Sequence, residues 1–188
     1  MGGHAYLNPG VVIGSVIWNG LGIVDALLYL LMEFLAAGAA VLVCMIFFYD
    51  SFKESGDAPK RGIFAAYPVK RNFLLNFVQE ILATFVFLFL VFMGIAGVTT
   101  TTADNQSLVI GAVGFGTVAL MALSLNSTGF SMNAMRSVFS SIWFAILPIP
   151  NKNKEKVDWT YQLVVNLVGS SIGGVLAVIA TGLVKAAL

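Results

Sequence analysis

The chain has few charged residues, which limits what kind of protein it can be. Asp, Glu, Lys and Arg make up 10% of its 188 residues, whereas soluble domains carry about 25%. Hydrophobic residues make up 59%, and the mean hydropathy is +0.92. This composition excludes an ordinary soluble domain and predicts an integral membrane protein. A net charge of +1 gives no reason to expect nucleic acid as a partner.

Cysteine and histidine are nearly absent as well. The single cysteine, Cys44, cannot form a disulfide within the chain, and its apolar surroundings indicate a small buried hydrophobe. The sequence offers no nucleophile–base pair and no cluster of metal ligands, so we expect neither an enzyme nor a bound metal or cofactor. Met1 leads directly into Gly2, Gly3 and His4, so no cleavable signal peptide is expected.

Long apolar runs are plentiful and predict an all-α membrane fold. A hydrocarbon core of ~30 Å takes about 20 helical residues to cross. Four stretches are long enough to be full transmembrane helices: Val24–Tyr49, Phe73–Val98, Leu108–Leu125 and Trp159–Val184. Polar links separate them at Asp50–Arg71, Thr99–Ser107 and Asn151–Asp158.

Two further apolar pieces are too short to span a membrane. As helices, Pro9–Asn19 would be roughly 16 Å long and Ala134–Leu147 roughly 21 Å, about half of the hydrocarbon thickness. Half-length helices occur at membrane depth where their lead-ins are buried or line a watery cavity. The alternative is a pair of amphipathic interface segments, but both pieces are apolar all round rather than basic on one face.

The two short pieces belong to an internal repeat. Residues 6–18 align without gaps to residues 131–143, and the matched pairs are Asn8 with Asn133, Ser15 with Ser140, Ile17 with Ile142 and Trp18 with Trp143. After a short break, Asp25 pairs with Asp158 and Glu33 with Asn166. We therefore expect one domain over residues 1–188, with a partial first repeat at 1–49 and a second at 72–188. By this symmetry the first repeat lacks two amino-terminal helices. A working site is expected where the copies meet.

Each half-helix begins at an asparagine. Asn8 followed by Pro9 is a strong helix start, and Asn133 with Ala134 keeps the cap without the proline. When the side-chain oxygen caps the backbone, the NH₂ group is free to donate into a cavity. Each helix amino end also carries unpaired N–H groups and about half a positive charge. Two such ends facing each other favour a neutral, hydrogen-bonding solute and disfavour a cation or proton.

Arg136, Glu33 and Glu80 are charged residues inside apolar segments. Arg136 is on the first turn of the second half-helix, and a charge there is expected to face a cavity; the alternative is snorkelling to the interface. Glu33 and Glu80 lie inside spans and need hydrogen-bond donors, for which the N–H groups of the half-helix lead-ins are the candidates. A proton relay is the alternative reading of these glutamates.

Together these features resemble the aquaporin and glycerol-facilitator family. Residues 128–136, T-G-F-S-M-N-A-M-R, are similar to the second family signature, T-G-x-x-x-N-P-A-R, and Ala5–Gly10 is similar to the first. Residues 64–68, F-A-A-Y-P, and 76–80, N-F-V-Q-E, resemble the glycerol branch around its fourth helix. The resemblance implies an aquaporin-like inverted-repeat bundle of four full helices and two re-entrant half-helices, with the first two family helices missing.

The resemblance also implies roles for particular residues. Asn8 and Asn133 would be the donors of a central constriction, and Arg136 would form an outer selectivity filter with Phe130 and Met121. Glu80 would brace the second half-helix lead-in, and Pro9 and Glu33 would support the half-helices. Family members form homotetramers with one pore per subunit, in the plasma membrane.

Several positions depart from the family pattern. Gly10 replaces the usual alanine of the first signature, and Ala134 and Met135 replace Pro-Ala in the second. The missing proline weakens preorganisation by about 0.4–1 kcal/mol, and the long Met135 side chain would narrow the lumen. The basic links Asp50–Arg71 and Asn151–Asp158 would be cytoplasmic by the positive-inside rule, whereas the family places them outside; we follow the family.

The sequence therefore predicts a channel that passes glycerol, other small neutral solutes and water down their gradients. Two alternatives stay open. One is a truncated, non-conducting membrane protein that at most assembles with intact subunits. The other is a coupled secondary transporter with broken helices, although acidic residues at the helix breaks are missing.

Overall fold

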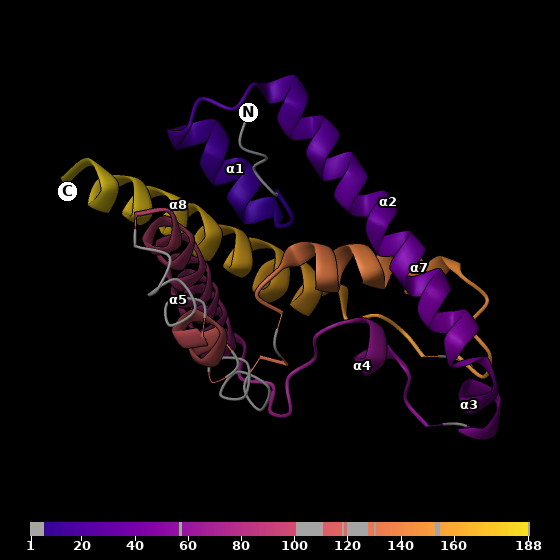
Figure 1. Ribbon diagram of the computed structural model, residues 1–188. Helices are drawn as coiled ribbons and strands as arrows, with labels where there is room; N and C mark the ends of the chain where they lie inside the picture. The colour runs from indigo at the N-terminus through magenta and orange to yellow at the C-terminus, as the bar shows by residue number, and fades with distance from the viewer. Residues whose placement is uncertain are drawn as a thin grey trace.

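The computed structural model describes residues 6–56, 58–100, 111–117, 119, 128–129, 131–152 and 155–187. Every regular element in this part of the chain is a helix (Figure 1). In chain order the elements are α1 (Pro9–Trp18), α2 (Ile23–Phe47), α3 (Tyr49–Glu54), α4 (Arg61–Phe64), α5 (Phe73–Thr100), η1 (Met135–Phe139), α7 (Ser140–Ile146), η2 (Tyr161–Gly169) and α8 (Ser170–Ala187). Residues 111–117 are helical too.

Three of the four predicted spans lie in the described residues. The helices long and apolar enough to cross a membrane are Ile23–Phe47, Phe73–Gly94 and Tyr161–Ala187, the last made of η2 and α8 in one continuous rod. Their ends fall within a few residues of the predicted ones. The fourth predicted span, Leu108–Leu125, lies mostly outside the described residues.

Both predicted half-helices are present. α1 begins at Pro9 and ends at Trp18, after which Gly20 turns the chain with a φ of 71°. The second half-helix runs from Met135 to Ile146 as η1 followed by α7. Its first turn is a π-helix, which the sequence does not predict; single π turns inside helices occur often at functional sites.

Each half-helix packs against a long helix of the other repeat. α1, from the first repeat, lies against α8, and α7, from the second, lies against α2 (Figure 1). The α1–α8 contact depends on small residues, since a Cβ on Gly174 would lie 2.8 Å from the backbone of Gly10. The α7–α2 contact centres on Trp143, whose Nε1 donates to Phe34 O at 3.0 Å and whose ring covers Gly38.

Two apolar clusters fix these contacts. One lies between α1, α5 and α8 and contains Val11, Leu88, Ala177 and Val178. The other joins α2 and α7 to the polar links and contains Val41, Phe52, Phe64, Phe144 and Ile149. The links predicted as polar connections thus hold the short helices α3 and α4, each of which contributes a buried phenylalanine to this second cluster.

Candidate functional site

The amino end of α1 is built around Asn8. The side-chain oxygen Oδ1 of this residue accepts a hydrogen bond from Gly10 N at 2.9 Å, and Pro9 occupies the first helical position. Asn8 itself has an extended backbone, with φ −150° and ψ 122°, as an N-cap requires. The side chain is 5% exposed, so the start of α1 lies inside the protein.

The second half-helix begins in the same way at Asn133. Its Oδ1 accepts from Met135 N at 2.9 Å, again from the backbone two residues further on. Asn133 is half-buried. The two residues paired by the sequence repeat therefore make the same cap.

The side-chain amides then cross between the repeats. Asn8 Nδ2 donates to Met132 O at 2.8 Å, and Asn133 Nδ2 donates to Leu7 O at 2.7 Å. Each asparagine thus binds the carbonyl of the residue that precedes the other one. The sequence predicts that both NH₂ groups are free to donate into a cavity, whereas one N–H of each amide binds the opposite lead-in. An amide carries two N–H donors, so one on each side chain is left for another acceptor.

Glu80 supports the lead-in to Asn133. This glutamate on α5 is fully buried, and its Oε1 accepts from Met132 N at 2.5 Å and from Thr84 Oγ1 at 3.5 Å. Met132 has a φ of 48°, a left-handed conformation that non-glycine residues adopt only when their surroundings enforce it. With its N–H bound by Glu80 and its carbonyl by Asn8, Met132 is held from both sides.

Glu33 makes no hydrogen bond to the lead-in residues that the structure describes. Its side chain is 5% exposed, and neither carboxyl oxygen has a hydrogen-bond partner in the described part of the chain. The expected bond to lead-in N–H groups is therefore wrong for these residues. The physical reason is that the lead-in N–H groups already have acceptors: Met132 N–H is bound by Glu80, and the asparagine caps bind those of Gly10 and Met135. Glu33 lies on the buried stripe of α2 with Ala26, Ala37 and Val41.

The predicted outer filter is only partly described. Arg136 lies in the π turn at the start of the second half-helix and is exposed. Phe130 and Met121, the other two members predicted for this filter, lie outside the described residues.

A segment between α4 and α5 is anchored against the start of the second half-helix. Ala66 N donates to Ser137 Oγ at 3.3 Å, and Ala66 O accepts from Gln162 Nε2 at 3.0 Å and Asn166 Nδ2 at 3.1 Å. The three side chains are fully buried. Sequence reasoning misses this anchor, although a signal is present: Gln162 and Asn166 are polar residues one turn apart inside a predicted span.

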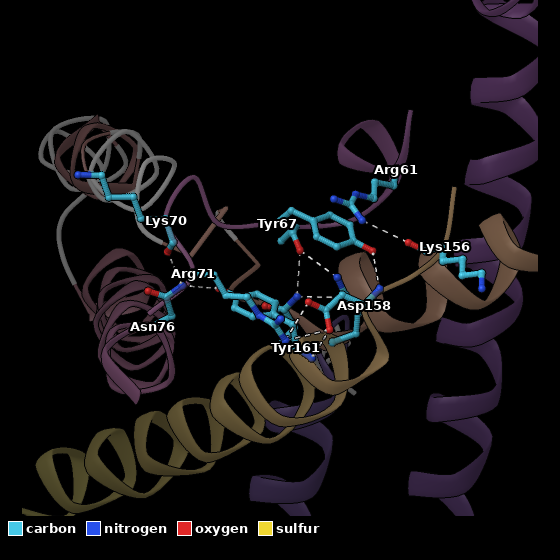
Figure 2. Close-up of polar contacts among 11 residues, drawn as sticks. Arg61, Tyr67, Lys70, Arg71, Asn76, Lys156, Asp158 and Tyr161 are labelled. Carbon is cyan, nitrogen blue, oxygen red and sulfur yellow. Dashed lines mark hydrogen bonds and ion pairs between the residues drawn. The ribbon is translucent and has the colours of Figure 1, made fainter. Parts of the chain in front are cut away.

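The polar links are joined to each other next to this segment (Figure 2). Arg71 forms an ion pair with Asp158 at 3.1 Å, and the N–H of Asp158 donates to the Tyr67 hydroxyl at 3.4 Å. Arg61 Nη1 donates to Lys156 O at 3.3 Å, and its guanidinium lies 4.6 Å from the Tyr67 ring centre. Burial raises the pKa of the Tyr67 phenol, so this group stays protonated at neutral pH.

Tyr161 carries the same network into the bundle (Figure 2). Asn76 Nδ2 donates to Lys70 O and to the Tyr161 hydroxyl, both at 3.1 Å, and that hydroxyl donates to Thr128 O at 3.3 Å. The network connects α5, η2 and the chain just before the second half-helix. It fixes the approach to Asn133 from the side of the polar links.

Comparisons with known proteins agree with this architecture. The sequence profile of the major intrinsic protein family matches residues 1–181. Glycerol uptake facilitator protein 2 of Lactiplantibacillus plantarum is 32% identical, with 94% of this chain and 72% of that protein aligned. A probable glycerol uptake facilitator protein of Thermotoga maritima is 31% identical over 92% of this chain and 70% of its own length. The D/L-lactic acid transporter of L. plantarum is 28% identical over 93% of this chain and 72% of its own length.

A helical membrane bundle with paired half-helices is thus the class of protein that the fold and site define. The chain belongs to the major intrinsic protein family. The predicted family and the aquaporin-like helical fold are confirmed, and the protein is an integral membrane protein.

Proposed function

We propose that this protein is a membrane channel for the passive diffusion of glycerol and other small neutral solutes, with water as a further permeant. Transport proceeds down a concentration gradient, without a chemical step or a bound cofactor. The observation that carries the proposal is the crossed pair of asparagines, Asn8 with Met132 O and Asn133 with Leu7 O. The names of the similar glycerol uptake facilitators support glycerol as the solute.

The crossed pair suits a hydroxylated solute for two reasons. Each amide has one N–H beyond the cross-link, and two N–H donors that lie close together can bind the oxygens of one small polyol in turn. The positive ends of α1 and the second half-helix meet at the same place, which raises the energy of a cation or proton there. A neutral molecule with acceptor oxygens passes this point most easily.

The other site residues support this centre. Glu80 holds the second lead-in through Met132, and Pro9 fixes the first helical turn of α1. Arg136, with Phe130 and Met121, forms the outer constriction, where its guanidinium offers several fixed donors to solute hydroxyls. Glu33 is left out of the supporting set because its carboxyl oxygens make no hydrogen bond in the described part of the chain.

We further propose that the working form is a homotetramer in the plasma membrane. A single domain over residues 1–188, with a partial first repeat at 1–49 and a second at 72–188, provides one pathway per subunit. Many large apolar side chains of α2 are exposed, such as Leu27, Leu31 and Leu35. These side chains suit contact with lipid or with neighbouring subunits.

Solute flux into liposomes tests the proposal. The purified protein is reconstituted, and glycerol entry is followed by light scattering after an osmotic step, with lactate, water and a sugar as parallel solutes. We expect glycerol entry well above that of empty liposomes and no dependence on an ion gradient. Asn133→Asp keeps the oxygen that caps Met135 N but removes the donors and adds a negative charge, so glycerol flux should fall. Arg136→Ala should let larger solutes through.

The same assay separates the alternatives. Glycerol flux equal to that of empty liposomes, with folded protein in the membrane, indicates a non-conducting family member. Saturable uptake that requires a sodium or proton gradient indicates a coupled transporter. Unchanged glycerol flux in both variants would disprove the assignment of the site.

A further inference from the structure

The carboxyl end of the second half-helix is bound by a lysine side chain. Lys152 Nζ donates to the carbonyl oxygens of Phe144 at 2.8 Å, Ala145 at 3.0 Å and Leu147 at 2.9 Å. The last carbonyls of a helix have no partner within the helix and carry about half a negative charge. An ammonium group has three N–H donors, and here each has a carbonyl at the end of α7.

The turn that follows α7 is held by packing and by hydrogen bonds, so the backbone that carries Lys152 has a defined position. Ile149 is buried in the apolar cluster at the links, and Asn151 turns the chain with a φ of 51°. Asn151 Nδ2 donates to Phe52 O at 3.2 Å and Lys53 O at 2.7 Å, near the end of α3. Two adjacent side chains therefore bind two helix ends, and together they tie the second half-helix to α3.

The first half-helix ends differently. The side chain of its C-cap residue, Asn19, donates to Ser15 Oγ at 3.3 Å, and no lysine in the described part of the chain binds its last carbonyls. Lys60 also binds carbonyls, those of Gly56 and Ala58, but these belong to its own link and not to a half-helix. Of the two half-helices, the second has a lysine bound at its carboxyl end and the first does not.

We propose that Lys152 is a positioning residue of the solute pathway, because its ammonium group fixes the half-helix that carries Asn133 and Arg136. η1 and α7 form one rod from Met135 to Ile146. A shift of the end held by Lys152 is transmitted along the rod to the end that carries Asn133. This inference rests on the proposed channel function. It adds a residue in the polar link Asn151–Asp158 that sets the geometry of the solute pathway.

A role in positioning and a role in folding alone make different predictions. A lysine needed only for folding changes how much folded protein is present, and fluxes of all solutes then fall together. A lysine that positions the half-helix changes the width and donor geometry of the pathway, and the ratio of fluxes changes. The decisive quantity is therefore the ratio of the permeability for glycerol to that for a larger polyol, measured in the same liposomes.

The experiment compares two lysine-to-methionine variants of the reconstituted protein. Lys152→Met keeps an apolar stem but removes all three N–H donors. Lys156→Met is the matched control, because Lys156 is exposed in the same link and contributes its carbonyl oxygen, not its side chain, to the bond with Arg61. We expect Lys152→Met to lower glycerol flux per folded protein several-fold and to change the flux ratio, while Lys156→Met leaves both unchanged.

Chemical rescue tests whether the N–H donors are the cause. Lys152 lines an open surface pocket together with Pro59, Arg61 and Asn151, so the Lys152→Ala variant leaves space at this residue that a small cation can enter. Methylammonium at high concentration has the N–H donors to fill that place, whereas tetramethylammonium has the same charge and none. We expect methylammonium alone to restore glycerol flux and the flux ratio.

Each outcome decides the question. If the unaltered protein gives no glycerol flux, the proposed function fails and this inference falls with it. If the unaltered protein conducts but Lys152→Met matches it, or lowers all fluxes in proportion, Lys152 does not position the pathway. Equal rescue by both cations, or by neither, would rule out the carbonyl contact as the cause.

Discussion

The two half-helices reach the same geometry at the asparagines by different means. α1 is α-helical from Pro9 onward and lies against α8 through glycine surfaces at Gly10 and Gly174. The second half-helix starts with a π turn, and polar groups hold it at both ends: Glu80 at its lead-in and Lys152 at its carboxyl end. Both pack against a long helix, and the second also has side-chain hydrogen bonds with Glu80 and Lys152 at its two ends.

This difference follows from the sequence at matched positions of the repeat. Gly10 pairs with Met135, and a long side chain at the second position prevents the close helix contact that glycine allows at the first. Pro9 pairs with Ala134, so the second half-helix also lacks the fixed φ of proline. Hydrogen bonds with Glu80 and Lys152 at the two ends take the place of both features. Variants that remove one kind of support should therefore affect one half-helix and not the other.

The largest effect is expected at Glu80. Glu80→Leu leaves Met132 N–H buried without its acceptor, which costs about 1–3 kcal/mol, and frees the strained lead-in to Asn133. Glycerol flux should fall close to that of empty liposomes, with a lower midpoint of thermal unfolding. Glu80→Gln is the control, since its amide oxygen still accepts from Met132 N. Flux through Glu80→Leu equal to that of the Gln variant would show that this bond does not support the pathway.

A matched pair of alanine variants tests the packing of the first half-helix. A Cβ on Gly10 would lie 3.0 Å from Ser170 O and from the backbone of Ser171, so Gly10→Ala should force α1 away from α8 at a cost of about 1–3 kcal/mol. Met135→Ala, at the matched position, removes bulk beside Asn133 and should leave glycerol flux at least as high as before. Thermal unfolding and flux are measured on both. If Gly10→Ala keeps its thermal midpoint and glycerol flux while Met135→Ala loses them, close packing is not what holds the first half-helix.

The paired tryptophans should also respond differently. Trp143 Nε1 donates to Phe34 O at 3.0 Å, so Trp143→Phe should lower the free energy of unfolding by about 0.5–1.5 kcal/mol. The indole of Trp18 makes no hydrogen bond within the described residues and is 43% exposed, so Trp18→Phe should have a smaller effect. Unfolding in denaturant measures both, and a larger loss for Trp18→Phe would contradict the assignment.

The smallest effect is a gain in stability. Ala134 has a φ of −60°, close to the value that proline imposes, so Ala134→Pro should stabilise the second half-helix by about 0.4–1 kcal/mol through the unfolded state. The expected result is a small rise in the thermal midpoint with unchanged glycerol flux. A drop in the midpoint would mean that the N–H of residue 134 has a partner that the folded protein needs.

The pieces that could be predicted from the sequence are those fixed by local chemistry. Asn8 followed by Pro9 specifies a helix start, and the length of an apolar run specifies whether it spans, so both half-helices and three spans fall where expected. The repeat correctly pairs Asn8 with Asn133. The repeat does not show where the amide N–H groups point. In the structure, one N–H of each asparagine amide binds the opposite lead-in.

The missed features depend on contacts that no local sequence pattern specifies. Nothing local to Ala66 indicates that Ser137, Gln162 and Asn166 converge on it, because these contacts form only when the link folds back between two helices. The cap by Lys152 depends on the turn at Pro150 and Asn151 after α7, whereas the sequence alone indicates only a charged link from Asn151 onward. The sequence predicts that the buried Glu33 finds lead-in N–H donors, whereas it lies on the buried stripe of α2 and its carboxyl oxygens make no hydrogen bond in the described part of the chain.

The most direct test of the crossed asparagine pair is a crystal structure of the protein in lipid with glycerol. We predict that Asn8 Nδ2 lies within hydrogen-bond distance of Met132 O and Asn133 Nδ2 within the same distance of Leu7 O. A glycerol oxygen should accept from the remaining amide N–H. Density showing the two asparagines apart, or glycerol bound elsewhere with this point closed by side chains, would contradict it.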